Sequence, residues 1–189
     1  MKKFSLMIGL MICAIAGVSA QSLTFEGNIE PLKNVGTYDV EFDYSELYVE
    51  NLPVKEFLAT KDGKFNNDWE SDIVVTAEEV AKLLPAYFNK NLTFNTSSPK
   101  YVFVLRLKGL LLGNAGSQFI PFASAKAGGA TITGQFDIMD AQTREVIGIL
   151  HFNNFKGYNS GYDFSDKGRW RMAYLTLVKP VKKLIKKTK

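Results

Sequence analysis

The sequence has very little cysteine and histidine, with one of each among 189 residues. Cys13 lies within the first twenty residues, so the rest of the chain has no thiols from which to build a disulfide framework. A single histidine, His151, excludes a metal site made of several histidines. The chain also lacks a Gly-x-Ser-x-Gly motif and a phosphate-binding glycine loop. We therefore expect no catalytic residues, metal site or cofactor, and interpret His151 as a strand residue at a sheet face or rim.

Long apolar runs are absent beyond residue 20, so no later segment is expected to span a membrane as a helix. The first twenty residues are typical of a secretory signal peptide. Two lysines precede the apolar stretch Leu6–Val18, and small residues end it at Ala20. A lipoprotein signal requires a small residue before its cysteine, and Ile12 stands there instead. We expect residues 1–20 to be removed on export, and the protein to be periplasmic or extracellular without a lipid anchor.

Positive charge is scarce outside the C-terminal tail. Beyond residue 20 the chain carries 21 lysines and arginines against 19 acidic residues, a net charge of +2. Six of these lysines lie in residues 179–189, so residues 21–178 carry 15 basic against 19 acidic residues, a net charge of −4. A nucleic-acid-binding protein spreads basic residues over a docking face, and we therefore expect no nucleic-acid partner.

Four segments have the composition and period of β-strands. In the first, Tyr38, Val40 and Phe42 alternate with acidic residues, which predicts one buried and one solvent-facing side. The second is rich in β-branched and aromatic residues, and the last two are separated by a three-residue hairpin turn. The region before them, residues 21–36, has no clear period and is expected to form an N-terminal arm. The four strand segments are residues 37–49, 100–112, 130–140 and 144–155.

Helical spacing of apolar residues predicts three helices. Residues 53–60 form a short one that starts at Pro53, and residues 61–75 are expected to be a polar connection. Thr76 then caps a helix, with Glu79 reaching back to it, and Pro85 kinks that helix near its end. The last helix begins after Ser165 or Asp166 and keeps its apolar stripe as far as Ile185 despite Pro180.

This order of elements predicts an α+β fold with a single domain over residues 37–189. One mostly antiparallel sheet would carry helices packed on one face, giving a two-layer sandwich. The segments VEFDYSELYV, NDWESD and GYDFSDKGRWRMAYLTLVKPVKKLIKK resemble those of uncharacterised secreted proteins of Gram-negative gut anaerobes. The architecture is also similar to the TolB N-terminal domain and to curli-secretion lipoproteins. The resemblance implies a small α/β domain and an envelope location, and it implies no specific activity.

The segment from Gly157 to Tyr174 is rich in glycines, aromatic residues, arginines and aspartates. In one interpretation, Tyr158, Tyr162, Arg169 and Arg171 line a pocket, with arginines for an anionic group and tyrosines for a ring or sugar. In the other, the glycines permit a tight turn and Ser165 or Asp166 caps the helix that follows. We favour the second interpretation, in which the segment is a hinge into the last helix.

Residues 113–129 form a connection longer than the 4–6 residues or so that are typical of compact domains. Phe119, Ile120 and Phe122 stand in it among small residues. Apolar side chains on a loop are often a contact surface for a protein or a bilayer. Equally, these residues can fold back and close one edge of the core, and the sequence leaves the two interpretations open.

Two charged patterns have an ordinary structural explanation. Asp39, Glu41 and Asp43 follow strand spacing, which predicts a solvated sheet face because a calcium site needs converging oxygen ligands. Four lysines share one face of the last helix, where they complement the helix dipole or contact anionic lipid. These are Lys182, Lys183, Lys186 and Lys187.

Three hypotheses follow from the sequence. The first is an exported, non-enzymatic cell-envelope binding or accessory module that contacts an envelope protein or a glycan through Phe119, Ile120, Phe122 and Tyr158 with their neighbours. The second is a protein that handles a small ligand or carbohydrate, with hydrolysis as one option, through Tyr162, Arg169 and Arg171 with Tyr158. The third is peripheral membrane attachment through the lysine-rich tail. The oligomeric state does not follow from the sequence.

Overall fold

The computed structural model describes residues 20–114, 128–158 and 165–188. Its strands form one eight-stranded sheet in the order β1-β8-β7-β6-β2-β5, and the short strand β3 pairs with both β4 and β6. The pairs among β1, β8, β7 and β6 are antiparallel, whereas β2 is parallel to β6 and to β5. The strands are β1 (Ser22–Gly27), β2 (Gly36–Asp43), β3 (Tyr48–Val49), β4 (Leu52–Pro53), β5 (Leu92–Phe94), β6 (Tyr101–Leu111), β7 (Thr131–Asp140) and β8 (Val146–Lys156).

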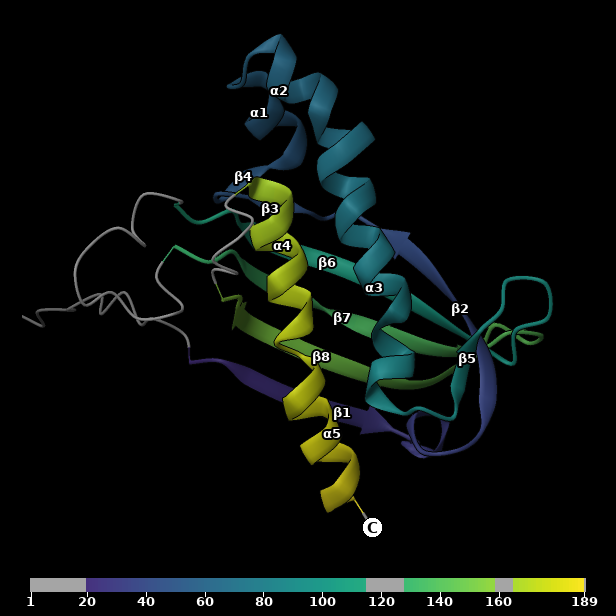
Figure 1. Ribbon diagram of the computed structural model, residues 1–189. Helices are drawn as coiled ribbons and strands as arrows, with labels where there is room; N and C mark the ends of the chain where they lie inside the picture. Colours follow the sequence, from purple (N-terminus) through teal and green to yellow (C-terminus); the bar gives the residue numbers. More distant parts are fainter. Residues whose placement is uncertain (1–19, 115–127, 159–164, 189) are drawn as a thin grey trace, which may run out of the picture.

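The long helices α3, α4 and α5 lie across one face of this sheet, and α1 and α2 lie beyond its end, beside the start of the helical layer (Figure 1). α3 packs against α4, and α4 lies over β7 and β8. The predicted α+β fold, one mostly antiparallel sheet with helices on one face, is confirmed. The helices are η1 (Glu30–Leu32), α1 (Val54–Ala59), α2 (Gly63–Asp68), a π-helical turn η2 (Trp69–Val74), α3 (Val75–Phe88), α4 (Asp166–Leu175) and α5 (Val178–Lys187).

The core lies between the sheet and the helical layer. Tyr38 on β2 and Phe103 on β6 are fully buried under α3, while Phe136 on β7 continues the same aromatic row. Trp170 and Tyr174 on α4 are also fully buried. The strand predicted for residues 37–49 is confirmed as far as Asp43, where β2 ends, whereas residues 44–47 are not in a strand and β3 holds only Tyr48–Val49. The hairpin predicted between β7 and β8 is confirmed.

The segment expected to be an arm is instead partly an edge strand. β1 pairs with β8 from Ser22 to Gly27, and Leu23 and Phe25 pack against the core from the helix side. Only two apolar residues alternate there, so the period is too short to detect in the sequence alone.

The segment expected to be a polar connection is mostly helical. The Asp62 carboxylate accepts a hydrogen bond of 2.7 Å from the Phe65 N–H and caps α2. Trp69 and Ile73 are buried one helical turn apart. Because the helix already runs through residue 75, Thr76 does not cap it and lies inside it, where its hydroxyl donates to Asp72 at 3.3 Å. The predicted capping box is therefore wrong.

The two prolines lie at different places in their helices, and the kink predicted at Pro85 stays a prediction. Pro85 lies inside α3, and the buried Tyr38 hydroxyl sits against this turn, donating a hydrogen bond of 2.9 Å to the Lys82 carbonyl. Pro180 lies in the first turn of α5, just after a break that separates α4 from α5. The last helix is therefore two helices. Its predicted start is correct, because the Ser165 hydroxyl caps α4 by accepting from the Gly168 N–H at 3.1 Å.

In the described part of the chain, no helix has both the length and the apolar character needed to cross a membrane.

Candidate functional site

The sheet face opposite the helices carries charged side chains on neighbouring strands. Glu41 on β2 accepts two hydrogen bonds from Arg144, at 2.8 and 2.7 Å, in a bidentate pair at the surface. Farther along, Arg106 on β6 bridges Asp43 on β2 and Asp137 on β7. These groups lie on the side of the sheet that α3, α4 and α5 do not cover (Figure 1), and among them Asp137 is buried by its neighbours.

On the side of β6 that pairs with β2 and β3, the strand pairing is interrupted at one place. β2 pairs with β6 as far as Asp43, which lies opposite Arg106. β3 resumes the pairing with Tyr48 opposite Gly109. Between the two strands, residues 44–47 leave the sheet. Leu107 and Lys108 of β6 therefore lie beside this loop and have no paired strand on that side.

The inner edge of β6 is irregular at the same place. β7 pairs with Leu107 through Gly134 and then with Gly109 through Thr133, so Lys108 is an extra residue in the ladder, a β-bulge. Lys108 consequently has no register partner on either side among the described strands. Bulges of this kind re-aim side chains and are frequent beside binding sites.

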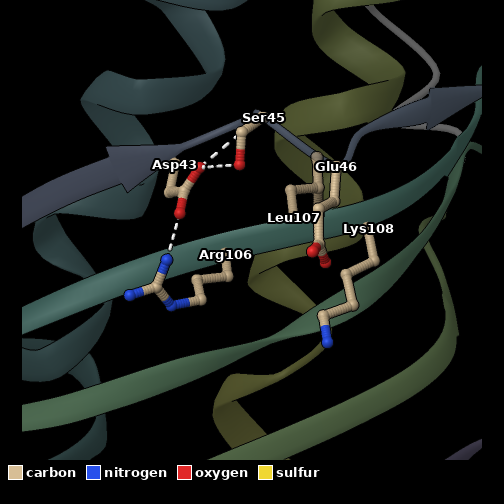
Figure 2. A pocket seen from close by; sticks show the side chains of 6 residues that line it. All are labelled: Asp43, Ser45, Glu46, Arg106, Leu107 and Lys108. Carbon is tan, nitrogen blue, oxygen red and sulfur yellow. Dashed lines mark hydrogen bonds and ion pairs between the residues drawn. The ribbon is translucent and has the colours of Figure 1, made fainter. Parts of the chain in front are cut away.

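A pocket of about 290 Å³ opens at this interruption. Figure 2 shows its side chains, with Asp43 and Ser45 on one wall and Arg106 and Lys108 along β6. A second hollow of about 890 Å³ adjoins it, because Ser45, Glu46 and Lys108 line both. The first pocket is lined by Asp43, Ser45, Glu46, Arg106, Leu107 and Lys108.

Asp43 and Arg106 are held in place by several bonds. The Asp43 carboxylate accepts from the Ser45 hydroxyl at 2.6 Å and the Ser45 N–H at 3.0 Å, and it also accepts from Arg106. The Ser45 bonds, together with the charge of Arg106, lower the pKa of Asp43. The Arg106 Nε donates to Asp137 at 2.6 Å, and Gln135 donates to the same carboxylate at 2.6 Å. The network fixes one rigid wall of the pocket.

Glu46 and Lys108 differ from that pair. Both side chains extend along the same side of the pocket as Arg106 (Figure 2), and both are exposed. Within the described ranges neither has a hydrogen bond or ion pair to another protein side chain. They are therefore the acceptor and the donor that the pocket offers to a ligand.

Asp43 is poorly suited to act as a general acid. A general acid needs a carboxyl group whose pKa is raised toward neutral pH, and the pKa of Asp43 is lowered instead. The Arg106 guanidinium is already matched by two carboxylates, which raise its pKa and keep it charged. The described residues hold no cluster of three or more histidine, cysteine, aspartate or glutamate side chains arranged for a metal ion.

Stability is expected to fall in acid through Asp43 and Glu41. Both pKa values are lower in the folded protein than the value of about 4 in an unfolded chain. Each group therefore stabilises the fold above pH 4 or so, and this contribution is lost as the pH falls through the folded-state pKa. Urea unfolding of the protein and of Asp43→Asn, measured from pH 6 to pH 2.5, should give midpoints that converge in acid. A difference between the two urea midpoints that stays constant over this pH range would contradict the stabilising role of the ionised Asp43 carboxylate.

The structure separates the residues proposed in the segment before the last helix. Arg169 is only 5% exposed, and its Nε donates to the Leu112 carbonyl at 2.8 Å while its guanidinium also pairs with Asp166. Arg171 points outward and is exposed, as is Tyr158. Two arginines two positions apart on a helix face different sides, so Arg169 and Arg171 do not share a pocket. This side chain joins α4 to the end of β6, and the ligand-contact role proposed for Arg169 stays a prediction.

Four of the proposed contact residues lie outside the described residues. These are Phe119, Ile120 and Phe122 of the long connection and Tyr162 of the glycine-rich segment. The tail lysines Lys182, Lys183, Lys186 and Lys187 lie exposed on α5, opposite the buried Val181. Membrane attachment through them stays a prediction.

His151 and the acidic strand residues lie near their expected places. His151 on β8 is partly exposed on the solvent-facing sheet surface, with its Nε2 3.5 Å from the Glu26 carboxylate. Asp39, Glu41 and Asp43 line the solvent-facing side of β2, but Glu41 and Asp43 are ion-paired and not simply solvated.

Sequence reasoning missed Ser45, Glu46, Arg106 and Lys108 as site residues. The available signal was the order Leu-Arg-Leu-Lys-Gly within the strongest strand, residues 105–109, where two cations alternate with apolar residues just before a glycine. The alternating cations indicate the solvent-facing side of the strand, and the glycine that follows them indicates a β-bulge beside it.

Comparisons with known proteins give little further information. No family profile matches the chain, and no curated protein matches it. Among solved structures, the PelC dodecamer from Paraburkholderia phytofirmans is 11% identical, covers 86% of this chain and 98% of that chain, and superposes with a TM-score of 0.41. A single-substitution variant of the same dodecamer is 10% identical, with the same coverage and a TM-score of 0.38. A likeness at this level carries no argument about this chain, and the TolB-like and curli-lipoprotein-like resemblance stays a prediction.

Proposed function

We propose that this chain is an exported, non-enzymatic binding or accessory module of the cell envelope, and that it binds its partner in the pocket beside Lys108. The location rests on the N-terminal segment, which has the composition of a secretory signal. The binding role rests on the geometry of the uncovered sheet face.

One observation carries the binding role: the pocket combines a fixed wall with two exposed charged groups that have no side-chain partner among the described residues. Asp43 and Arg106 hold each other and their neighbours, so they need no rearrangement when a ligand arrives. Glu46 and Lys108 stand beside them and remain available. Preorganised walls with a few convergent polar groups are typical of ligand sites.

The alternative of a hydrolytic protein is less well supported. A hydrolase that uses two carboxylates needs one of them to be protonated as a general acid. Among the carboxylates that line the pocket, Asp43 has a lowered pKa and is ion-paired. Asp43 is therefore a poor candidate for the general acid of such a reaction.

The proposal is tested by cosedimentation of the purified protein with the envelope fraction of its own source. The double variant Glu46→Gln/Lys108→Ala removes both available charges. It is expected to weaken apparent affinity about tenfold or more, since each charge-assisted bond contributes about 1.5–3 kcal/mol. A matched control, Lys64→Ala/Glu70→Gln, changes one exposed lysine and one exposed glutamate that line no described pocket.

Three results would count against the proposal. The protein would fail to sediment with any envelope fraction, or the double variant would sediment as well as the control. Equally, tracking of the protein in its source cells would find it in the cytoplasm. Circular dichroism of each variant shows whether the fold is retained.

A further inference from the structure

The pocket beside Lys108 is one end of a longer track of hollows. The second hollow shares Lys108 with the first, and Tyr48 lines both the second hollow and a third. All three open along the β6 segment from Arg106 to Leu111 or the chain beside it. A ligand longer than one chemical group can therefore follow the track across the sheet face.

The charges along this track balance. The first two hollows are lined by three acidic and three basic side chains, and the third is lined by no charged residue. A polyanion such as a nucleic acid needs an excess of cations, and a polycation needs an excess of carboxylates. The balance of charges favours an uncharged polymer as the ligand. The charged residues are Asp43, Glu46, Glu56, Lys55, Arg106 and Lys108.

The third hollow is lined by amides and hydroxyls. Asn51, Thr133 and Asn154 line it, and the Thr133 hydroxyl already donates to Asn153 at 3.2 Å and accepts from the Asn154 N–H at 3.1 Å. A ligand that bonds well here must itself carry groups that both donate and accept, and hydroxyl groups do so. The lining of the track therefore matches a neutral chain that is rich in hydroxyls.

An exposed aromatic ring stands between the second and third hollows. Tyr48 is 51% exposed, and its register partner Gly109 has no side chain with which to cover it. An aromatic ring gains from burial of its face under an apolar surface while its hydroxyl stays hydrated. The C–H face of a sugar ring provides such a surface, and the sugar hydroxyls remain free to bond to either side.

From these observations we infer that the track binds a neutral polysaccharide or oligosaccharide, with Tyr48 as the stacking platform and with Lys108 and Asn154 on either side of it. This inference rests on the proposed function and specifies the chemical class of its partner. A basic or acidic polymer would need a different balance of charges along the track.

The test uses the same cosedimentation with three treatments of the envelope fraction. Sodium periodate cleaves the vicinal diols of sugars and should abolish binding. Proteinase K should leave binding intact, as should 1 M NaCl, because a charge-balanced track gains little from long-range attraction. Tyr48→Ala should weaken apparent affinity about tenfold, on the scale found when a base-stacking aromatic is replaced by alanine. Tyr87→Ala, an exposed tyrosine on α3, should have no effect.

The outcomes separate the two proposals. Binding that resists periodate, is lost with proteinase K or is lost in 1 M NaCl would overturn the saccharide inference. If the Glu46→Gln/Lys108→Ala effect persisted in that case, the binding module itself would stand with a different partner. Tyr48→Ala that binds as well as Tyr87→Ala would also overturn the inference. Absence of any sedimentation would end both proposals.

Discussion

Replacing Trp170 with alanine is expected to lower the free energy of unfolding by about 3–5 kcal/mol. Trp170 is fully buried in α4 and stacks between two other rings. Its ring centroid lies 5.7 Å from that of Trp69 and 6.2 Å from that of Tyr174, with interplanar angles of 24° and 26°. Removing it would leave a cavity where the π-helical turn, α4 and the sheet meet.

Urea unfolding monitored by far-ultraviolet circular dichroism measures this loss. The control is Arg171→Ala on the same helix, where an exposed side chain is removed and the change should stay within about 0.5 kcal/mol. A loss below about 1.5 kcal/mol for Trp170→Ala, or equal losses for the two variants, would show that the helical layer does not pack on the sheet as described.

The second large effect is expected for Gly134→Ala on β7, which should lower the free energy of unfolding by about 3 kcal/mol. A Cβ atom at this position would lie 2.4 Å from the Arg106 carbonyl oxygen and 3.1 Å from the Leu107 Cα. Both are backbone atoms of β6 beside the bulge, so they cannot move aside as a flexible side chain would. The strands would have to separate at the point where their register shifts.

Gly109→Ala is the matched control, since it adds the same methyl group to the other strand at the same irregularity. Its Cβ would lie 3.4 Å from the Thr133 Cβ, which is near ordinary van der Waals contact. Gly109→Ala should lower the free energy of unfolding by no more than about 1 kcal/mol, because alanine also restricts the unfolded chain more than glycine does. Equal losses for Gly109→Ala and Gly134→Ala would contradict the close approach of β7 to β6.

The strands with a strong local pattern were predictable from the sequence. The alternation around Tyr38 and the β-branched run ending near Leu111 each predict a strand, and both are confirmed. The helix over residues 63–74 was not predicted, because its apolar positions Phe65, Trp69 and Ile73 recur once per turn among polar neighbours. Burial of that narrow stripe depends on partners elsewhere in the chain, such as Trp170.

The candidate site was beyond prediction for a different reason. Arg106 meets Asp43 and Asp137 across two neighbouring strands, at separations of 63 and 31 residues. Such contacts depend on the register between strands, which a local period does not define. Conversely, the arginine that composition suggested, Arg169, is buried by the packing of α4 on the end of β6. Residue type alone did not distinguish an internal bond from a surface contact.

The bulge at Lys108 has a consequence for the alternation of β6. Leu107 and Leu110 both face the helices, although an uninterrupted strand would turn residues three apart to opposite faces. Loss of the single Lys108 codon would therefore restore strict alternation while every other side chain of β6 kept its present side. One deletion would thus remove a side chain of the proposed binding pocket while the rest of the strand kept its pattern.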